Sequence, residues 1–529
     1  MPGEDLFQKS PMREIELKLN LTEAAEKRMR ADRGLAAIST GRPRTIALKS
    51  VYFDTVDRRL AAAGIALRLR RQGRDWVQTL KQRGALRHGF SINDEFECPA
   101  PGGRLAIAAI PDTQAQADLK QALGTHALGP VCETRFRRTK RHILMPGAEI
   151  EMAIDVGEVT AGELREPLRE LELELISGDP AALFMLLRRL LPGGGMRFST
   201  TSKAARGMRL ADGAAAPTPT ARHARRVVLQ PEQTIEAAAG DILREALDQI
   251  AGNLIFLEKI ETPDPNGLKQ LRIGLRRLRT VLTMLRSQLG GPAAAGLSEE
   301  ARWLAAELGQ VRDLDVALSE IVEPEMDGDA GFAHLHKALA ARRNKARLRL
   351  MGEVLPSSRV QNFCVDLMAF VETRGWLARG DIGQSIRLAE PAARVARTVL
   401  AKRWRKVCRA AEGIADLDIE ARHALRKELK KLRYAIEYMR ALYPDETVKP
   451  FLKNLRKLQT LFGDLNDLAM AEALFLGPAA PAARDPQVQR AVGRILGARG
   501  ARAELAWVSA QECWENLLKA PRFWQMTRS

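Results

Sequence analysis

Cysteine is scarce in this chain of 529 residues, and the five cysteines that occur are scattered. They form no CxxC pair, and their odd number does not suit a framework of paired disulfides. The lack of a CxxC pair also excludes a zinc site built on close cysteine pairs. The pattern therefore suits a reducing compartment. The five are Cys98, Cys132, Cys364, Cys408 and Cys513.

Long apolar runs are also missing from the sequence. Because a membrane-spanning helix needs roughly 18 or more consecutive apolar residues, and no such run occurs, we expect no membrane insertion. The first residues, MPGEDLFQKSPMRE, are polar and lack the apolar centre of a secretory signal. The sequence thus predicts a cytoplasmic protein.

Acidic residues and aromatic residues are both in short supply. There are 65 acidic residues against 83 basic ones, which leaves a formal net charge of +18 and favours polyanionic partners such as nucleic acid, anionic membranes or phosphate polymers. Aromatic residues make up only 5% of the chain, which argues against single-stranded nucleic acid, whose bases usually stack on aromatic side chains. Nucleic-acid binding as such stays open, because net charge alone does not separate one polyanion from another.

The residues that are present fall into parts with different periodicity, as expected for a chain too long for one core. Residues 12–210 hold short alternating segments broken by turn signals, which predict an α+β domain with an antiparallel sheet and packed helices. Residues 211–232 lack periodicity and are rich in Ala, Pro, Thr and Arg, which predicts a linker. Residues 233–515 repeat Leu, Ala and Arg at helical spacing and predict an all-α domain.

The helical part repeats itself. KQLRIGLRRLR at 269–279 resembles HALRKELKKLR at 423–433, and LGQVRDLDVA at 308–317 resembles FGDLNDLAMA at 462–471. Both matches have the same offset of 154 residues (423 − 269 and 462 − 308). Two separate matches at one offset predict a duplicated helical bundle.

Charged residues follow one face of strand after strand in the first part. In REIELKLNL, at 13–21, Glu14, Glu16 and Lys18 alternate with apolar residues and therefore share one face. A solvated outer surface would show the same pattern. Arg, Lys and Glu dominate these faces, however, and a closed sheet would turn them into a wet, charged tunnel. The later members of the pattern are Arg68, Arg70, Lys81, Glu95, Glu97, Arg138, Lys140, Glu151, Asp155, Glu170, Glu172 and Glu174.

Such a tunnel has a definite chemistry. Several Arg and Lys side chains can hold polyphosphate oxygens, Arg by its two-pronged fork and Lys as a point charge. Clustered carboxylates would repel that substrate unless divalent cations lay between them, and Mg²⁺ prefers carboxylates together with substrate phosphates. The mixed charges therefore indicate metal-assisted phosphoryl transfer to water.

The segment Glu14-Ile15-Glu16-Leu17-Lys18 resembles the ExExK signature of the CYTH superfamily of triphosphate tunnel enzymes. Further blocks resemble the same family in order, and the resemblance covers residues 12–210. They are YFDT (52–55), ALRLR (66–70), TLK (79–81), EFE (95–97), RRTK (137–140), IEMAIDVGEV (150–159), ELELEL (170–175) and SKAARG (202–207). The resemblance implies an eight-stranded antiparallel tunnel and an inorganic triphosphatase that needs Mg²⁺ or Mn²⁺.

The resemblance also implies roles for individual residues. The expected phosphate ligands are Lys18, Arg68, Arg70, Lys81, Arg138, Lys140 and Lys203, of which Lys18, Arg68, Arg70 and Lys81 would act in catalysis. The expected metal-side carboxylates are Glu14, Glu16, Asp155, Glu170, Glu172 and Glu174. Inorganic triphosphate would be split into diphosphate and phosphate. Two alternatives stay open: a tunnel that only binds polyphosphate, and a triphosphatase that acts on thiamine triphosphate or nucleotides.

Basic residues recur on one stripe of a helix in both repeats of the second part, at i, i+3, i+7 and i+10. We call these the basic stripes; they are Lys269, Arg272, Arg276 and Arg279, and His423, Arg426, Lys430 and Arg433. A solvated helix face would look similar, but the recurrence favours a binding surface. The signature resembles the CHAD domain, with Lys269 in place of the motif's first His. This implies two pseudo-symmetric four-helix bundles, at about 233–370 and 385–515, that bind inorganic polyphosphate, and association with polyphosphate granules.

Overall fold

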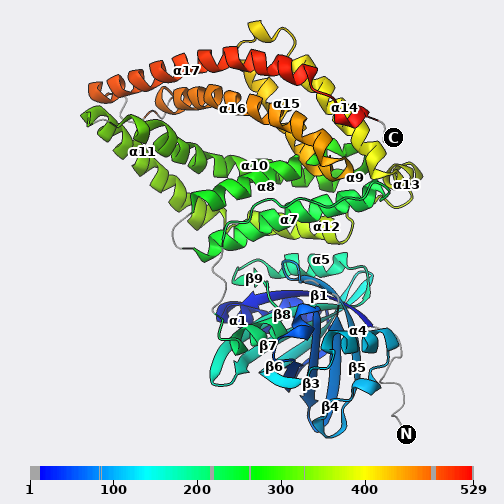
Figure 1. Cartoon of the computed structure of the whole chain (residues 1–529). Helices are drawn as coiled ribbons and strands as arrows, with labels where there is room; N and C mark the ends of the chain where they lie inside the picture. Colours follow the sequence, from blue (N-terminus) through cyan, green and yellow to red (C-terminus); the bar gives the residue numbers. More distant parts are fainter. Residues whose placement is uncertain are drawn as a thin grey trace. The chain divides into compact units, whose positions relative to one another are not determined.

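The computed structural model describes residues 12–526 except 83, 85, 215–219, 261–263, 327, 478–479 and 481–483. The chain divides into two compact units, Met1–Thr218 and Pro219–Ser529 (Figure 1). The first unit is α+β and the second is helical, as the sequence predicts. Within the described residues, no helix combines the length and the apolar character needed to cross a bilayer.

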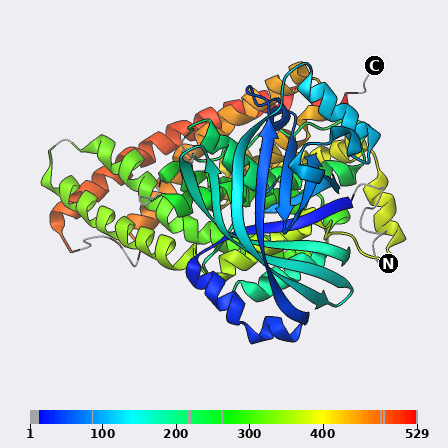
Figure 2. The same ribbon diagram turned by 90° about the horizontal axis from the view of Figure 1, so that it is seen from below.

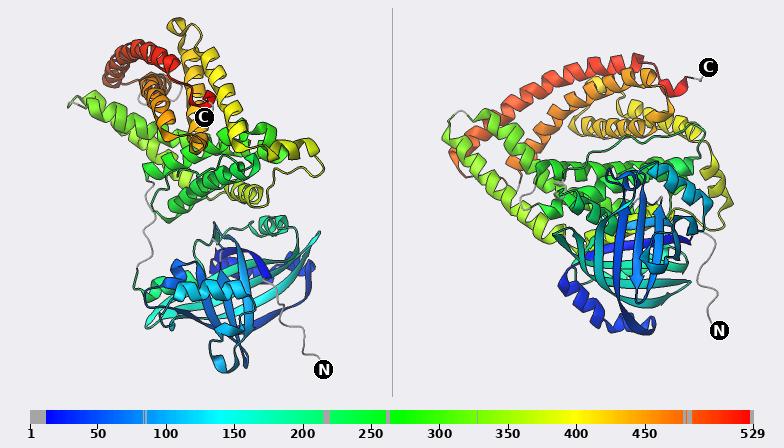
Figure 3. Two further views of the ribbon diagram at one scale, coloured as in Figure 1. Left: turned by 45° about the vertical axis from the view of Figure 1, so that its right-hand side comes forward. Right: turned by 60° about the horizontal axis from the view of Figure 1, so that its bottom comes forward.

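The first unit is built on a barrel of antiparallel strands (Figure 3). Its eight strands follow the order β5-β4-β3-β2-β6-β7-β8-β1. Pairing of β1 with β5 closes the ring, and the short strand β9 adds to β1 outside it. The eight-stranded antiparallel barrel that the resemblance implies is therefore confirmed. The strands are β1 Met12–Leu21, β2 Ser39–Asp54, β3 Ile65–Gln72, β4 Asp75–Gln82, β5 Phe90–Pro99, β6 Gly129–Met145, β7 Ala148–Ala161, β8 Leu164–Gly178 and β9 Met196–Phe198.

Strand register brings the charged faces together inside the barrel. Glu16 of β1 lies directly opposite Glu174 of β8, and Lys18 lies opposite Glu172. Because directly paired residues project to the same side of a sheet, all four side chains belong to one face. The alternate residue of β1, Leu17, is fully buried on the other face.

Helices cover the apolar outer face of the barrel. Around α4, a core cluster joins Leu119 to Leu67, Leu80 and Phe96 of three neighbouring strands. With the apolar face sealed in this way, the charged face is left to line the interior. The helices of this unit are α1 Glu23–Ala31, α2 Arg33–Ala37, α3 Arg59–Ala62, α4 Thr113–Leu123, α5 Ala181–Leu190 and α6 Lys203–Ala211.

In the second unit, the helices repeat at the offset seen in the sequence. Helix α8 begins at Pro265 after an Asp264 cap, and α15 begins at Ile419 after an Asp418 cap, 154 residues later (419 − 265). The helices are α7 Ile235–Lys259, α8 Pro265–Met284, α9 Arg286–Leu289, α10 Pro292–Val316, α11 Ala330–Arg349, α12 Ser358–Glu372, α13 Ile382–Ala389, α14 Ala392–Ala410, α15 Ile419–Met439, α16 Asp445–Phe475 and α17 Pro486–Lys519.

The two repeats share part of their core. Helix α11 of the first repeat packs along α17 of the second (Figure 2). One apolar cluster there contains Leu318 and Phe332 from the first repeat and Phe475 and Val492 from the second. At this end the repeats therefore form one structure, because each completes the other's core.

Truncating a residue of the barrel's outer core should destabilise the first unit. We expect Leu17→Ala to cost about 2–5 kcal/mol, which lowers the melting temperature by roughly 5–15 °C. As a control, Leu164→Ala removes the same atoms from a side chain that is 48% exposed and should change little. Thermal unfolding followed by circular dichroism measures both. Equal shifts for the two variants would contradict the burial of Leu17.

Candidate active site

The barrel encloses a cavity of about 810 Å³ whose lining is dominated by charged side chains. Its volume lies within the range of small-ligand sites, roughly 300–1,000 Å³. The charged residues that line it are Glu14, Glu16, Lys18, Arg68, Arg70, Lys81, Glu95, Glu97, Arg138, Lys140, Glu151, Glu172, Glu174 and Lys203. Residues that are far apart in the sequence thus line one space because the sheet is closed.

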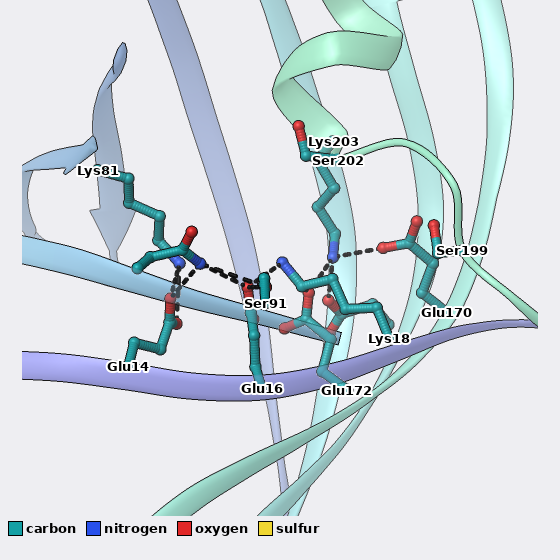
Figure 4. A network of polar contacts seen from close by, with 12 residues as sticks. Glu14, Glu16, Lys18, Lys81, Ser91, Glu170, Glu172, Ser199, Ser202 and Lys203 are labelled. Atoms are coloured by element: carbon teal, nitrogen blue, oxygen red, sulfur yellow. Dashed lines mark hydrogen bonds and ion pairs between the residues drawn. The ribbon is translucent and has the colours of Figure 1, made fainter. Parts of the chain in front are cut away.

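The carboxylates of β1 are held by neighbouring strands (Figure 4). Lys81 Nζ of β4 donates to Glu14 Oε1 over 2.8 Å. Lys18 Nζ lies 2.8 Å from Glu16 Oε1. From β5, Asn93 Nδ2 donates to Glu16 over 3.1 Å and Ser91 Oγ donates to the same oxygen over 3.0 Å. The two acids are therefore fixed in place by one lysine each and by two uncharged donors.

A buried ionic cluster closes another part of the cavity, where α6 begins. Lys203 Nζ lies 2.9 Å from Asp155, 2.7 Å from Glu170 and 2.7 Å from Glu172. Burial alone would lower the pKa of Lys203, but Glu170, Glu172 and Asp155 raise it well above its ordinary value. Arg138 Nε donates to Asp155 over 2.7 Å. Figure 4 shows the lysine reaching down from its helix to the acids.

The segment SKAARG places Lys203 through its neighbours. Ser202 caps α6 by accepting from the Ala205 amide, so that the helix starts at the lysine. One turn later, Arg206 Nε donates to Glu166 over 2.8 Å. At Gly207, a Cβ would lie only 2.1 Å from the Cys132 sulfur of β6. The glycine thus lets α6 lie close enough to the sheet for the lysine to enter.

The two arginines of β3 differ sharply in their partners. Arg68 lies 3.1 Å from Glu95, whereas no hydrogen bond or ion pair joins Arg70 to any residue in the described part of the chain. Burial lowers the pKa of Arg70 to about 10, and repulsion from Arg68 and Arg138 adds to this shift. The cavity therefore holds a positive charge that lacks a counterion.

A carboxyl group without an ion-pair partner in the described part of the chain occupies the same cavity. Glu174 of β8 has no hydrogen-bond or ion-pair partner among the residues that the structure describes. Burial raises the pKa of Glu174 to about 7, with further contributions from Glu14 and Glu151. The barrel thus combines an unpaired base and an unpaired acid, which is the arrangement expected of a site for an anion and a cation together.

The basic stripes of the second unit meet each other. Burial lowers the pKa of Lys430 on α15 to about 7, and the next contributions come from Arg276 on α8 and from Arg426. Arg433 and Arg272 act in the same direction. Arg272 lies 3.1 Å from Asp313 of α10. The two stripes therefore form one concentrated positive surface.

Family comparisons agree with both halves of this geometry. The CYTH domain family matches residues 12–208, and the CHAD domain family matches residues 241–476. The chain is a CYTH domain followed by a CHAD domain. The CYTH domain supplies the barrel and the CHAD domain supplies the repeated helices.

Among curated proteins, an inorganic triphosphatase of Haemophilus influenzae is 29% identical over 201 residues, which cover 37% of this chain and 54% of that relative. The chain thus spans about half the length of this relative. An uncharacterized protein of Mycobacterium tuberculosis is 26% identical over 455 residues, covering 79% of this chain and 80% of the relative.

Two solved structures are similar to parts of the chain. A CHAD domain from Ricinus communis has 25% identity and a TM-score of 0.49, and it covers 57% of this chain and 99% of its own. A Hippeastrum protein with a dominant triphosphatase activity has 22% identity and a TM-score of 0.29, and it covers 39% of this chain and 98% of its own.

The structure brings most of the predicted CYTH residues to the cavity wall and places two of them elsewhere. Asp155 and Glu170 are fully buried and do not line the cavity. Their oxygens contact Lys203, Arg138 and Arg206. These two acids therefore hold basic residues in position, and the cavity-facing carboxylates are better placed to meet a cation.

Sequence reasoning missed the uncharged donors Ser91 and Asn93, and also Arg206. The signal for the first two exists in SINDEFE, where they alternate with apolar residues and precede Glu95 on the same face. Nothing local marks them as partners of β1, because that contact comes from the closure of the barrel.

The carboxylate set of the CYTH domain suits a hard divalent cation by its chemistry. All candidate donors that face the cavity are oxygens, which Mg²⁺ and Mn²⁺ prefer, and Glu174 still lacks a counterion. In the described residues, no three acidic, histidine or cysteine side chains are arranged as a ready ligand set. Lysine ammonium groups contact the carboxylates instead, as Lys81 contacts Glu14. A cation would therefore have to replace lysine contacts.

The unequal partners of Arg68 and Arg70 predict opposite effects on stability. Arg70→Met removes an unpaired buried charge, so the melting temperature of the free protein should rise by roughly 2–8 °C. Arg68→Met removes an ion-pair partner of Glu95 and should lower the melting temperature by a few degrees. Both variants should bind triphosphate more weakly in calorimetry. A loss of stability in Arg70→Met as large as in Arg68→Met would contradict the unpaired state of Arg70.

Proposed function

We propose that the CYTH domain hydrolyses inorganic triphosphate to diphosphate and phosphate with Mg²⁺ or Mn²⁺, and that the CHAD domain binds inorganic polyphosphate. The observation that carries the proposal is the coexistence of the unpaired Arg70 and the unpaired Glu174 in one closed cavity. A metal–triphosphate complex would neutralise both. The similarity of this half to a triphosphatase supports the same substrate class.

The bases around the cavity suit a compact chain of phosphates. Arg68, Arg70 and Arg138 can offer planar forks to phosphate oxygens. Lys18 and Lys81 can bind further phosphate oxygens as point charges, because both line the cavity and carry their ammonium groups on flexible side chains. The ligand would thus be held from several strands at once, which fixes its orientation before reaction.

Binding would exchange partners without leaving charge exposed. In the free protein, Lys81 neutralises Glu14 and Lys18 neutralises Glu16. A triphosphate draws the two lysines toward its oxygens and leaves the carboxylates to a cation. When bound, a divalent cation would withdraw charge from the phosphate oxygens and lower the pKa of attacking water. Ser91 and Asn93 would keep Glu16 in place during the exchange.

The CHAD domain would hold the polymer by its basic stripes. Burial lowers the pKa of Lys430 on α15, and repulsion from Arg276 on α8 and from Arg426 lowers it further. A polyanion removes that repulsion on binding, and its release of counterions makes binding salt-dependent, as for other phosphate polymers.

The substrate assay tests the enzymatic half of the proposal. With Mg²⁺ or Mn²⁺, the wild type should release phosphate from inorganic triphosphate faster than from thiamine triphosphate, ATP or long-chain polyphosphate. Glu14→Ala/Glu16→Ala should reduce the rate by at least about a hundredfold, because transition-state charge loses its cation. No release from triphosphate by the wild type would exclude the enzyme and favour a binding protein.

The same assay separates the work of the two domains. Arg272→Ala/Arg426→Ala should keep triphosphatase activity and lose most binding of long-chain polyphosphate, measured by retention on a polyphosphate-coated surface. Loss of both activities together would contradict independent roles for the CYTH and CHAD domains.

Polyphosphate binding should strengthen as the pH falls through 7. Lys430, with its pKa near 7, gains a proton and a positive charge in this window, so affinity should rise about 3–10-fold from pH 8 to pH 6. His423 contributes less, since burial and then Arg426 lower its pKa from the ordinary value. Lys430→Met should remove the pH dependence, and the exposed control Lys337→Met should keep it. An unchanged pH profile in Lys430→Met would refute the assignment.

A further inference from the structure

A second basic cavity, of about 400 Å³, lies within the helical unit. One wall is the irregular segment at residues 222–226, which comes before α7, and the others are α8, α15 with the turn after it, and α16. We call this cavity the arginine pocket; its guanidinium groups are those of Arg225, Arg226, Arg277, Arg433, Arg440 and Arg456.

The arginine pocket uses a different face of α8 from the basic stripe. Gln270, Ile273 and Arg277 line the pocket and recur at i, i+3 and i+7. The stripe residues Arg272 and Arg276 lie roughly 110° away around a helix of 3.6 residues per turn. Of the eight stripe residues, Arg433 alone also lines the pocket. The pocket is thus a neighbouring site with its own residues.

Positive charge in the pocket exceeds the acids that contact it. Glu437 lies 3.0 Å from Arg433, 3.7 Å from Arg456 and 3.9 Å from Arg277. Asp445 lies 3.0 Å from Arg440 and 3.3 Å from Arg226.

Two carboxylates therefore contact five of the six guanidinium groups, and part of the donor capacity is unused. In the part of the chain that the structure describes, the buried Nε atoms of Arg277, Arg433 and Arg440 have no hydrogen-bond acceptor. Arg277 is only 6% exposed and stacks on the ring of Tyr438, with its guanidinium carbon 4.4 Å from the ring centre. Buried donors without acceptors are costly, so these groups are arranged for an anion that supplies them.

The irregular segment is fastened to the helices, so its arginines are held at the pocket. Asn253 of α7 is fully buried, accepts from the Arg222 amide over 3.0 Å and donates to the Arg222 carbonyl over 2.9 Å. The Arg225 amide donates to Glu245 over 2.6 Å. A buried asparagine that bonds both backbone groups of one residue fixes the path of the segment.

We propose that the arginine pocket binds a short phosphate anion of the size of diphosphate. Guanidinium forks match tetrahedral phosphate oxygens in pairs, and several of them favour a multiply charged anion over a single carboxylate. The volume exceeds that of one phosphate group, which leaves room for two or three linked groups. The ligand is either free diphosphate or the end of a longer polyphosphate. The site does not depend on hydrolysis in the CYTH barrel.

Hydrogen exchange on the full chain tests this site locally. Diphosphate is titrated in the presence of EDTA, and exchange is followed in the peptide that covers residues 220–230. We expect saturable protection, because the anion immobilises Arg225 and Arg226. Arg456→Ala lies outside the peptide, and its side chain is 57% exposed, so the fold should persist. The variant should reduce the affinity for diphosphate about tenfold, because one charged hydrogen bond to the anion is lost.

Matched variants separate the pocket from the two other phosphate sites. Arg70→Met in the barrel, Arg272→Ala/Arg426→Ala in the stripes and the exposed control Arg394→Ala should each leave the titration unchanged. Arg225→Ala/Arg226→Ala should weaken diphosphate binding in calorimetry by about tenfold or more. Titration with long-chain polyphosphate distinguishes the sources: protection by the polymer alone identifies a chain end as the ligand.

Three results would overturn the proposal. The first is the absence of protection by both diphosphate and long-chain polyphosphate. The second is equal protection by sulfate, which would show only general charge screening. The third is a titration that weakens with Arg272→Ala/Arg426→Ala but not with Arg456→Ala, because binding would then belong to the stripes. Absence of triphosphatase activity alone would not contradict diphosphate binding in the arginine pocket.

Discussion

The pairing of β1 with both β8 and β5 is the contact on which the rest of the CYTH domain depends. It closes the sheet and so takes the charged face out of bulk water, where each isolated charge would be costly. Every carboxylate and base inside must then find a partner or carry a shifted pKa. Glu14 and Glu16 each form an ion pair with a lysine, whereas Arg70 and Glu174 form no ion pair within the described residues and carry shifted pKa values. The chemistry of the cavity is a consequence of this closure.

The fold was largely predictable from the sequence because its signals are local. Alternation of Glu14, Glu16 and Lys18 with apolar residues indicates a strand with two unlike faces wherever that strand lies. The helical repeat is visible in short repeated motifs, and their 154-residue offset recurs in the helix starts at Pro265 and Ile419. The sharing of a core by α11 and α17 was not predictable, because packing between distant helices leaves no short pattern.

The candidate site was predictable in its residue types but not in its pairings. Arg68 and Arg70 stand on one strand and one face, and the sequence treats them alike. The structure separates them, because Glu95 forms an ion pair with Arg68, whereas no acid among the described residues forms one with Arg70. In the same way, Asp155 shares a face with Glu151 but is enclosed by Arg138 and Lys203. Such differences arise from strand register and helix placement, which are long-range properties.

The segment at residues 222–226 shows where composition misleads. Its lack of periodicity predicts a plain linker, and it has no regular secondary structure. Backbone hydrogen bonds to Asn253 nevertheless fix Arg222, and the following arginines line a cavity. Irregular backbone can be as well determined as a helix when buried side chains satisfy its amide and carbonyl groups. The basic residues of this segment therefore belong to the binding chemistry of the helical unit and not to a passive connection.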